Sequence, residues 1–154
     1  MAAKLIDAAE TLLNSGQRSS AFRRRAVSTA YYGVFHALTR KCADYLTHFA
    51  PRDTEEYNRV YRALDHGPLK QAFGQTTLTN NATLAEIGGS VVRLQAERHK
   101  ADYAPPVLGV FSLPEAQQLV ALARKTVEQI QALQIGSPEV RTLATTLHFS
   151  GKRK

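Results

Sequence analysis

The sequence predicts an all-α protein, an up-and-down bundle of four to five helices with a short C-terminal extension. Two observations support this fold class. Apolar residues recur at intervals of three and four along most of the 154 residues, and Ser, Thr or Asp stands three residues before Glu at several points, as in helix N-caps. No useful length of the sequence alternates polar and apolar residues as a strand does. We expect one helical domain over residues 1–135, with a short helix and a basic tail over 136–154.

The first two helices have clear start and stop signals. Residues 3–14 place apolar side chains on one stripe, and Gly16 follows as a C-terminal stop. A long second helix is expected to begin at Ser19 or Ser20. It should run to about His48, because a proline follows shortly after.

The next elements are predicted from capping patterns. Asp53 and Thr83 each stand three residues before a glutamate, so they are expected to open the third and fourth helices. The third helix is expected to break at residues 66–68, followed by a short helical turn through Phe73. Residues 74–82 then read as a loop.

Two further helices complete the prediction. Ser112 and Glu115 repeat the capping pattern and open a fifth helix, whose small and apolar residues recur at three and four. Ser137 and Pro138 mark the start of a last short helix.

Composition excludes several classes of protein. The sequence has no uninterrupted apolar run of the roughly 18 residues that a membrane span needs. Its first residues contain Asp and Glu where a signal peptide would have an apolar stretch. We therefore expect a cytoplasmic protein without a membrane partner. The single cysteine, Cys42, is interpreted as a buried thiol that forms no internal disulfide and is not a nucleophile. The five histidines lack paired metal-ligand spacing and no Gly-rich phosphate loop is present, so neither a metal nor a cofactor is expected.

The net charge of +7 and the pI near 9.8 favour a polyanionic partner such as RNA. The excess lies between Arg18 and Arg25 and in the terminal GKRK, residues 151–154. Arg23, Arg24 and Arg25 are the candidate nucleic-acid surface. A solvated basic face that only aids solubility explains the charge equally well.

The segment RRRAVSTAYYGVFHAL, residues 23–38, sorts its side chains onto separate strips of one helix. A ridge of small residues predicts close packing of another helix; it comprises Ala26, Ala30, Gly33 and Ala37. Ser28, Tyr32 and His36 step by four and form a polar strip. These three side chains either line a cleft or satisfy their polar atoms at an ordinary helix contact.

The fourth helix has an arginine at a position where its apolar pattern predicts leucine. Its seam runs through Leu84, Ile87, Val91 and Leu94. The next position is Arg98, which needs an anionic partner or a water-filled cleft, because an unpaired buried guanidinium is costly. Asp102 is the nearest candidate; alternatively, Arg98 extends past the end of the bundle. Gly88 and Gly89 predict the close approach of another backbone.

Three segments in order resemble the HEPN superfamily, specifically its small stand-alone prokaryotic members. They are RRAVSTAYYGVFHAL, HGPL with Phe73 after it, and RHKADYAP, and the resemblance covers about residues 3–133. It implies a helical bundle, commonly a symmetric homodimer whose fourth helices meet around a cleft. Many HEPN domains are metal-independent endoribonucleases in toxin–antitoxin, CRISPR-linked or anti-phage defence systems.

The resemblance also implies the site residues. The family's active motif is an arginine, a polar residue and, a few residues on, a histidine; here Arg98 and His99 match the first two, and Asp102 accompanies them. Tyr103 stands where the histidine should be, which puts catalysis in doubt, because tyrosine with an ordinary pKa of about 10 is a poor base. His99 neighbours Arg98 and so points about 100° away around the helix.

Three functions remain open from the sequence. The first is an RNA-directed protein, a metal-independent ribonuclease or a diverged relative, with His36 or His66 reaching the cleft from other helices. The second is a non-catalytic binding module partnered with a nucleotidyltransferase or a larger defence complex, with Tyr103 as a contact or as the acceptor of a transferred nucleotide. The third is a pure assembly role, in which the small residues only mediate packing.

Overall fold

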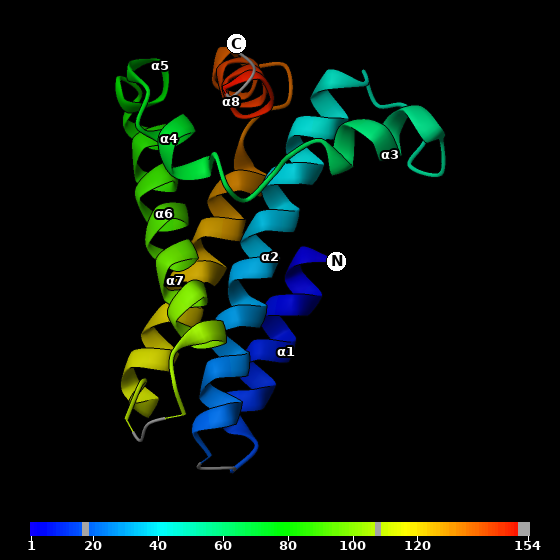
Figure 1. Ribbon diagram of the computed structural model, residues 1–154. Helices are drawn as coiled ribbons and strands as arrows, with labels where there is room; N and C mark the ends of the chain where they lie inside the picture. The colour runs from blue at the N-terminus through cyan, green and yellow to red at the C-terminus, as the bar shows by residue number, and fades with distance from the viewer. Residues whose placement is uncertain (17–18, 107–108, 151–154) are drawn as a thin grey trace. The chain divides into compact units, whose positions relative to one another are not determined.

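The computed structural model describes residues 1–16, 19–106 and 109–150. Within these ranges the protein is all-α, as predicted: eight helices and no strand are present (Figure 1). The helices are α1 (Ala2–Asn14), α2 (Ser20–Leu46), α3 (Glu55–Arg62), α4 (Leu69–Phe73), α5 (Thr76–Thr79), α6 (Ala82–Tyr103), α7 (Leu113–Ala132) and α8 (Pro138–Phe149). None of the helices in the described ranges combines the length and apolarity needed to cross a membrane.

Contacts group the chain into two compact units. Unit 1 comprises Met1–His36 and Arg93–Glu128, and unit 2 comprises Ala37–Val92 and Gln129–Lys154. The long helices α2, α6 and α7 contribute residues to both units. The domain boundary predicted after residue 135 stays a prediction, since this grouping follows contacts and places α8 in the same unit as α4 and α5.

In unit 1, α1 packs closely on the small-residue ridge of α2. A Cβ added to Gly33 would lie 2.8 Å from Ile6 Cδ1 and 3.2 Å from the Ala2 carbonyl oxygen. The predicted close approach is therefore confirmed at this glycine. Arg124 of α7 also holds α1: its Nε and Nη2 donate to the two carboxylate oxygens of Glu10 at 2.6 and 2.8 Å. Such bidentate pairs fix orientation as well as charge.

In unit 2, α4 and α5 pack against α8. The Gly88-Gly89 pair of α6 lies in this unit, and the prediction about it is only partly right. A Cβ on Gly88 would lie 2.6 Å from Phe73 Cδ1, whereas one on Gly89 would meet nothing within 4 Å. The close neighbour is thus an aromatic side chain of α4, not a backbone, and only one of the glycines is needed for it.

Four start and stop signals are confirmed. Gly16 follows α1 with a φ of 75°, the left-handed conformation that glycine adopts at helix ends. Ser19 Oγ accepts from the Ala21 N–H at 3.1 Å where α2 begins. Ser112 and Glu115 form the reciprocal cap of α7, with bonds of 2.7 and 3.2 Å. Ser137 caps α8, accepting from the Val140 N–H.

The predicted caps of the third and fourth helices are wrong by one or two residues. Thr54, not Asp53, caps α3: its Oγ1 accepts from the Tyr57 N–H at 3.3 Å. Asn81, not Thr83, caps α6, with its Oδ1 accepting from the Leu84 N–H at 3.0 Å. In both places neighbouring short polar side chains compete for the same role, and local spacing alone does not decide between them.

Three helix ends also differ from the prediction. The short helix α5 forms within residues 74–82, which were expected to be a loop, and α3 ends at Arg62, before the expected break at 66–68. Helix α2 ends at Leu46 because His48 and Phe49 take left-handed φ values of 50° and 61°.

The α2 terminus is closed by two backbone bonds. The His48 N–H donates to the Tyr45 carbonyl at 3.2 Å, and the Phe49 N–H donates to the Asp44 carbonyl at 2.9 Å. These are the two bonds of a Schellman motif, with histidine at the position that glycine usually occupies. Because the sequence has no glycine at this position, it predicts the end of α2 at about His48 and not at Leu46.

Candidate functional site

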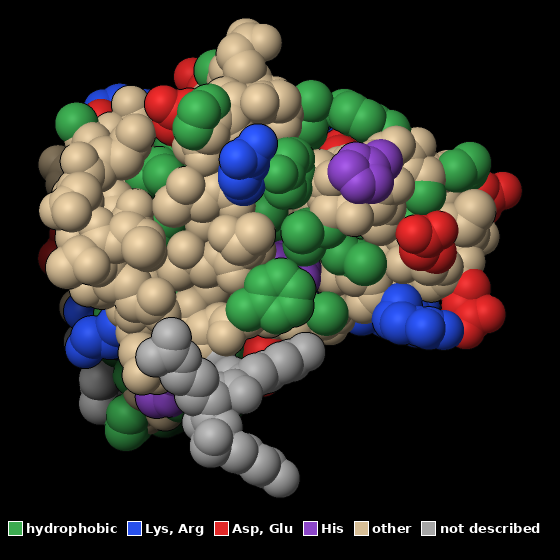
Figure 2. Space-filling view, turned by 90° about the horizontal axis from the view of Figure 1, so that it is seen from above, with side chains coloured by type: hydrophobic (Ala, Val, Ile, Leu, Met, Phe, Trp, Pro, Cys, Tyr) green, Lys and Arg blue, Asp and Glu red, His purple; other side chains and the backbone are tan. Residues whose placement is uncertain are grey.

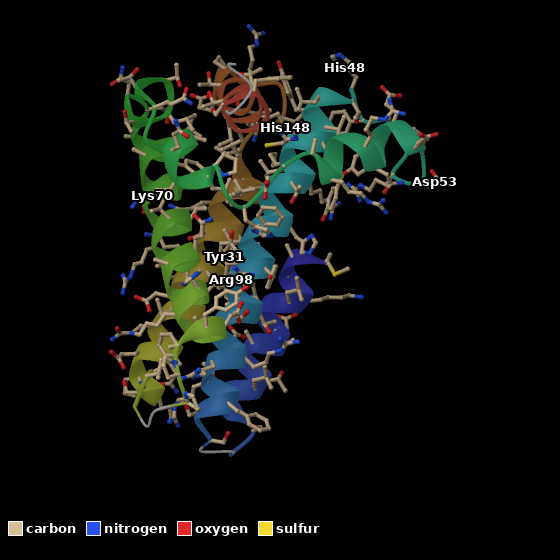
Figure 3. All side chains as sticks on the ribbon, in the orientation of Figure 1. Tyr31, His48, Asp53, Lys70, Arg98 and His148 are labelled. Carbon is tan, nitrogen blue, oxygen red and sulfur yellow. The ribbon has the colours of Figure 1, made fainter. Side chains whose placement is uncertain are left out.

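The seam arginine of α6 lies against the polar strip of α2 in unit 1. The four preceding seam residues are buried, as predicted: Leu84, Ile87, Val91 and Leu94. Arg98 follows them, with 19% of its side chain exposed, and its Nη2 donates to Tyr32 Oη at 2.7 Å. Figure 3 labels Arg98 on α6 and, on α2, Tyr31, which precedes Tyr32 in the sequence. The arginine therefore has partners, and it sits at the edge of the core, not outside it.

Asp102, one turn further along α6, is the predicted second partner of Arg98. Its Oδ2 lies 2.9 Å from Arg98 Nε, within ion-pair distance. The Nε–H is nevertheless buried and has no hydrogen-bond acceptor among the described residues, because it does not point at the carboxylate. The pair is thus held by charge without the directed hydrogen bond that would saturate the guanidinium.

Aromatic rings cover the same guanidinium. The Arg98 Cζ lies 5.4 Å from the centre of the Tyr32 ring and 5.9 Å from that of Tyr103, both within cation–π range. The Tyr103 ring in turn lies 4.8 Å from the ring of His99. Tyr103 therefore links the arginine to the histidine, even though the two neighbours point in different directions around the helix.

The outer part of this group is open to solvent. Tyr103 is 66% exposed, and His99 and Asp102 are also exposed. Partial burial lowers the pKa of Arg98, but the hydrogen bond to Tyr32 and the negative potential of Tyr32, Asp102 and Tyr103 raise that pKa further. The guanidinium is therefore a fixed positive charge at every pH at which the protein folds. We call Tyr32, Arg98, His99, Asp102 and Tyr103 the Arg98 cluster.

The other members of the α2 polar strip have different environments. Ser28 is buried. His36 is half-buried, and its ring centre lies 6.3 Å from that of Phe35. Burial first, and the positive N-terminal amino group second, lower the pKa of His36 below its usual 6.5, so this imidazole is neutral at pH 7. Tyr32 contacts Arg98 through both its hydroxyl group and its ring.

Two of the three arginines predicted as a nucleic-acid surface bind the protein's own backbone. Arg23 Nε donates to the Phe111 carbonyl at 2.8 Å, and Arg24 donates to the carbonyls of Ala104, at 2.7 Å, and Pro105. Arg25 is exposed. Arg23 and Arg24 thus fasten the chain that follows α6, a role that the sequence did not indicate because the contacts span 80 residues or more.

The remaining candidates lie in unit 2 or outside the described residues. His66 belongs to unit 2, in the segment before α4, and is half-buried. Arg18 and the basic tail, residues 151–154, lie outside the described residues. Figure 2 shows one face of the molecule, on which the described Lys and Arg side chains are interspersed with acidic, hydrophobic and uncharged ones.

The chemistry available to the Arg98 cluster is that of a fixed cation beside exposed polar groups. A guanidinium neutralises phosphate charge, and the neighbouring imidazole and phenol are groups that hold or transfer protons. Within the described ranges, no three His, Cys, Asp or Glu side chains are grouped so that they could hold a metal ion. Comparisons with protein-family models, with curated proteins and with solved structures find no match for this chain.

Proposed function

We propose that the protein is a HEPN-type, RNA-directed protein of an up-and-down bundle class, acting as a cytoplasmic homodimer in toxin–antitoxin or anti-phage defence. The observation that carries the proposal is the placement of Arg98. A seam otherwise filled by buried apolar residues ends in a guanidinium whose Nε–H lacks an acceptor among the described residues and whose neighbours face solvent. The net charge of +7 supports a polyanionic ligand.

The proposed reaction is metal-independent cleavage of RNA by its own 2′-hydroxyl. The 2′-oxygen attacks the adjacent phosphorus as a base takes its proton, and the 5′-oxygen leaves with a proton from an acid. Arg98 stabilises the charge that develops on the phosphoryl oxygens. The imidazole of His99 is the proposed proton-transfer group, and Tyr103, whose ring centre lies 4.8 Å from that of His99, orients it and donates to the substrate.

Cleavage of mixed RNA in the presence of EDTA tests this proposal. We expect the wild type to cleave and Arg98→Ala to lose at least about 100-fold in rate, the size of effect seen when a transition-state charge partner is removed. Arg93→Ala is the matched control, because Arg93 is an exposed arginine on the same helix. No cleavage and no RNA binding by the wild type at low salt would refute the proposal, as would equal loss in both variants.

The second candidate is a binding module partnered with a nucleotidyltransferase, and the exposure of Tyr103 favours it. A phenol that is 66% exposed beside a fixed cation is accessible to an enzyme that transfers a nucleotide. Intact mass after incubation with a cognate nucleotidyltransferase and ATP separates the two functions. A nucleotide adduct that disappears in Tyr103→Phe supports the binding module; unmodified protein that still cleaves RNA supports the nuclease.

A further inference from the structure

Unit 2 contains an open groove unrelated to the Arg98 cluster. It has a volume of about 670 Å³, in the range of small-molecule sites. Its walls come from α4, α5 and α8, which pack against one another. The lining residues are Gln71, Gln75, Thr77, Thr145, Thr146, Phe149 and Ser150.

The wall chemistry of this groove is uncharged and rich in hydrogen-bonding groups. Two amides and four hydroxyls line it, and none of the lining residues is an acid or a base. A ligand whose charge lay inside the groove would lack a countercharge in the lining, so the group that enters is neutral and polar. Amide side chains offer a donor and an acceptor side by side, the pattern that pairs with nucleobase edges.

Hydrogen bonds within and between the elements hold the groove in shape. Gln75 Nε2 donates to Ser150 Oγ at 2.8 Å, which ties the residue before α5 to the end of α8. Thr145 Oγ1 donates to the Arg141 carbonyl at 2.8 Å and so keeps its lone pairs for a ligand. These polar groups are therefore placed by the fold before any ligand arrives, which lowers the entropy cost of binding.

Phe149 gives the groove an exposed aromatic surface. Phe149 is the last residue of α8, and its side chain is 59% exposed, whereas large apolar side chains are usually buried. A flat ring beside amides and hydroxyls is the combination with which proteins hold unpaired bases, by stacking on one face and hydrogen bonding at the edge.

We propose that the groove between α4, α5 and α8 binds an unpaired nucleobase of RNA, stacked on Phe149 and contacted at its edge by Gln71 and Gln75. The inference rests on the proposed RNA-directed function and gives it a second contact, in unit 2, that selects single-stranded over double-stranded substrate. Base stacking is tolerant of sequence, and the amides add a preference for adenine.

Binding of fluorescein-labelled decaadenylate, measured by anisotropy at low salt, tests this assignment. We expect Phe149→Ala to weaken binding by about tenfold or more and Phe149→Leu to weaken it as well, whereas Phe149→Tyr keeps it, because stacking needs a ring. Phe49→Ala is the matched control: Phe49 is also in unit 2 and is 61% exposed, but does not line the groove. Unchanged circular dichroism verifies folding.

The outcomes separate this inference from the proposed function. Wild-type affinity in Phe149→Ala, with cleavage that still depends on Arg98, overturns the groove assignment alone. Affinity that depends on Phe149 in a protein that does not cleave RNA supports the groove and overturns the nuclease. Adenosine monophosphate binding as tightly as decaadenylate overturns RNA as the ligand, and so does binding of a neutral oligosaccharide such as maltohexaose in its place.

Discussion

The position of Arg98 combines an unfavourable loss of hydration with several favourable contacts. Removing a guanidinium from water is costly, and this side chain is only 19% exposed. The phenol of Tyr32, the carboxylate of Asp102 and two aromatic faces offset that cost. The Nε–H is buried and lacks a hydrogen-bond acceptor among the described residues, so part of that cost stays uncompensated, and a phosphate would approach through the part of the side chain that is exposed.

The hydrogen bond from Arg98 to Tyr32 gives the first prediction. Tyr32→Phe keeps the ring against the guanidinium and removes only the acceptor, so the free energy of unfolding is expected to fall by about 1.5–3 kcal/mol, as for hydrogen bonds to charged groups. Urea denaturation measures it, with Tyr45→Phe on the same helix as the control. Identical midpoints for Tyr32→Phe and the wild type would mean that the bond contributes nothing.

The second prediction concerns the pH dependence of stability through His36. Its folded-state pKa is below the 6.5 of the unfolded chain, so the unfolded state binds more protons at acidic pH. His36 therefore lowers the free energy of unfolding once the pH falls below about 6.5. This effect is absent at about pH 8, where the imidazole is neutral in both states. We expect His36→Gln to lose less stability than the wild type between about pH 7.5 and pH 5.

Thermal melts across this pH range provide the measurement. His99→Gln serves as the control because His99 is an exposed histidine in the same unit. An equal acid-induced loss of stability in His36→Gln and in the wild type would show that His36 is not the group responsible.

At the scale of elements, the neighbouring glycines of α6 provide a matched pair. Gly89→Ala meets nothing within 4 Å and is expected to raise the free energy of unfolding by up to about 1 kcal/mol, because alanine favours helix. Gly88→Ala places a Cβ 2.6 Å from the Phe73 ring, and overpacking of this kind costs about 1–3 kcal/mol. Chemical denaturation of both variants measures the difference; equal effects would show that Phe73 moves freely.

The same scale shows how far local patterns determine helix ends. The cap at Ser112 was predicted correctly, since serine and glutamate there have no rival of the same type at neighbouring positions. Asp53 lies directly before Thr54, and both can cap a helix, so local spacing does not distinguish Asp53 from Thr54, the residue that caps α3. The end of α2 could not be predicted, because His48 has the left-handed conformation that glycine would have signalled.

At the scale of the whole molecule, the sequence predicted what depends on periodicity and missed what depends on long-range contacts. Arg98 and Asp102 lie four residues apart on one helix, and their pairing follows from helix geometry. That Tyr32 would be the hydrogen-bond partner required knowing which helices meet. The hydrogen bonds from Arg23 and Arg24 to carbonyls 80 residues or more away have no local signal in the sequence.

The proposed assembly state is the fourth prediction. A homodimer is expected, with twice the 17.0 kDa mass of one chain, because the proposed HEPN-type function implies a symmetric pair of chains. Sedimentation equilibrium at micromolar concentration measures the mass directly. A single species of one-chain mass at every concentration tested, with RNA cleavage intact, would contradict the dimeric site.

The claim on which this account depends is that Arg98 contacts a phosphate of RNA. The most direct measurement is the slope of log affinity against log salt for single-stranded RNA between about 50 and 200 mM, compared for the wild type, Arg98→Ala and Arg93→Ala. Each phosphate contact contributes about 0.7 to that slope on single strands, so Arg98→Ala should lower it by about that amount and Arg93→Ala should not. An unchanged slope in Arg98→Ala would contradict the account.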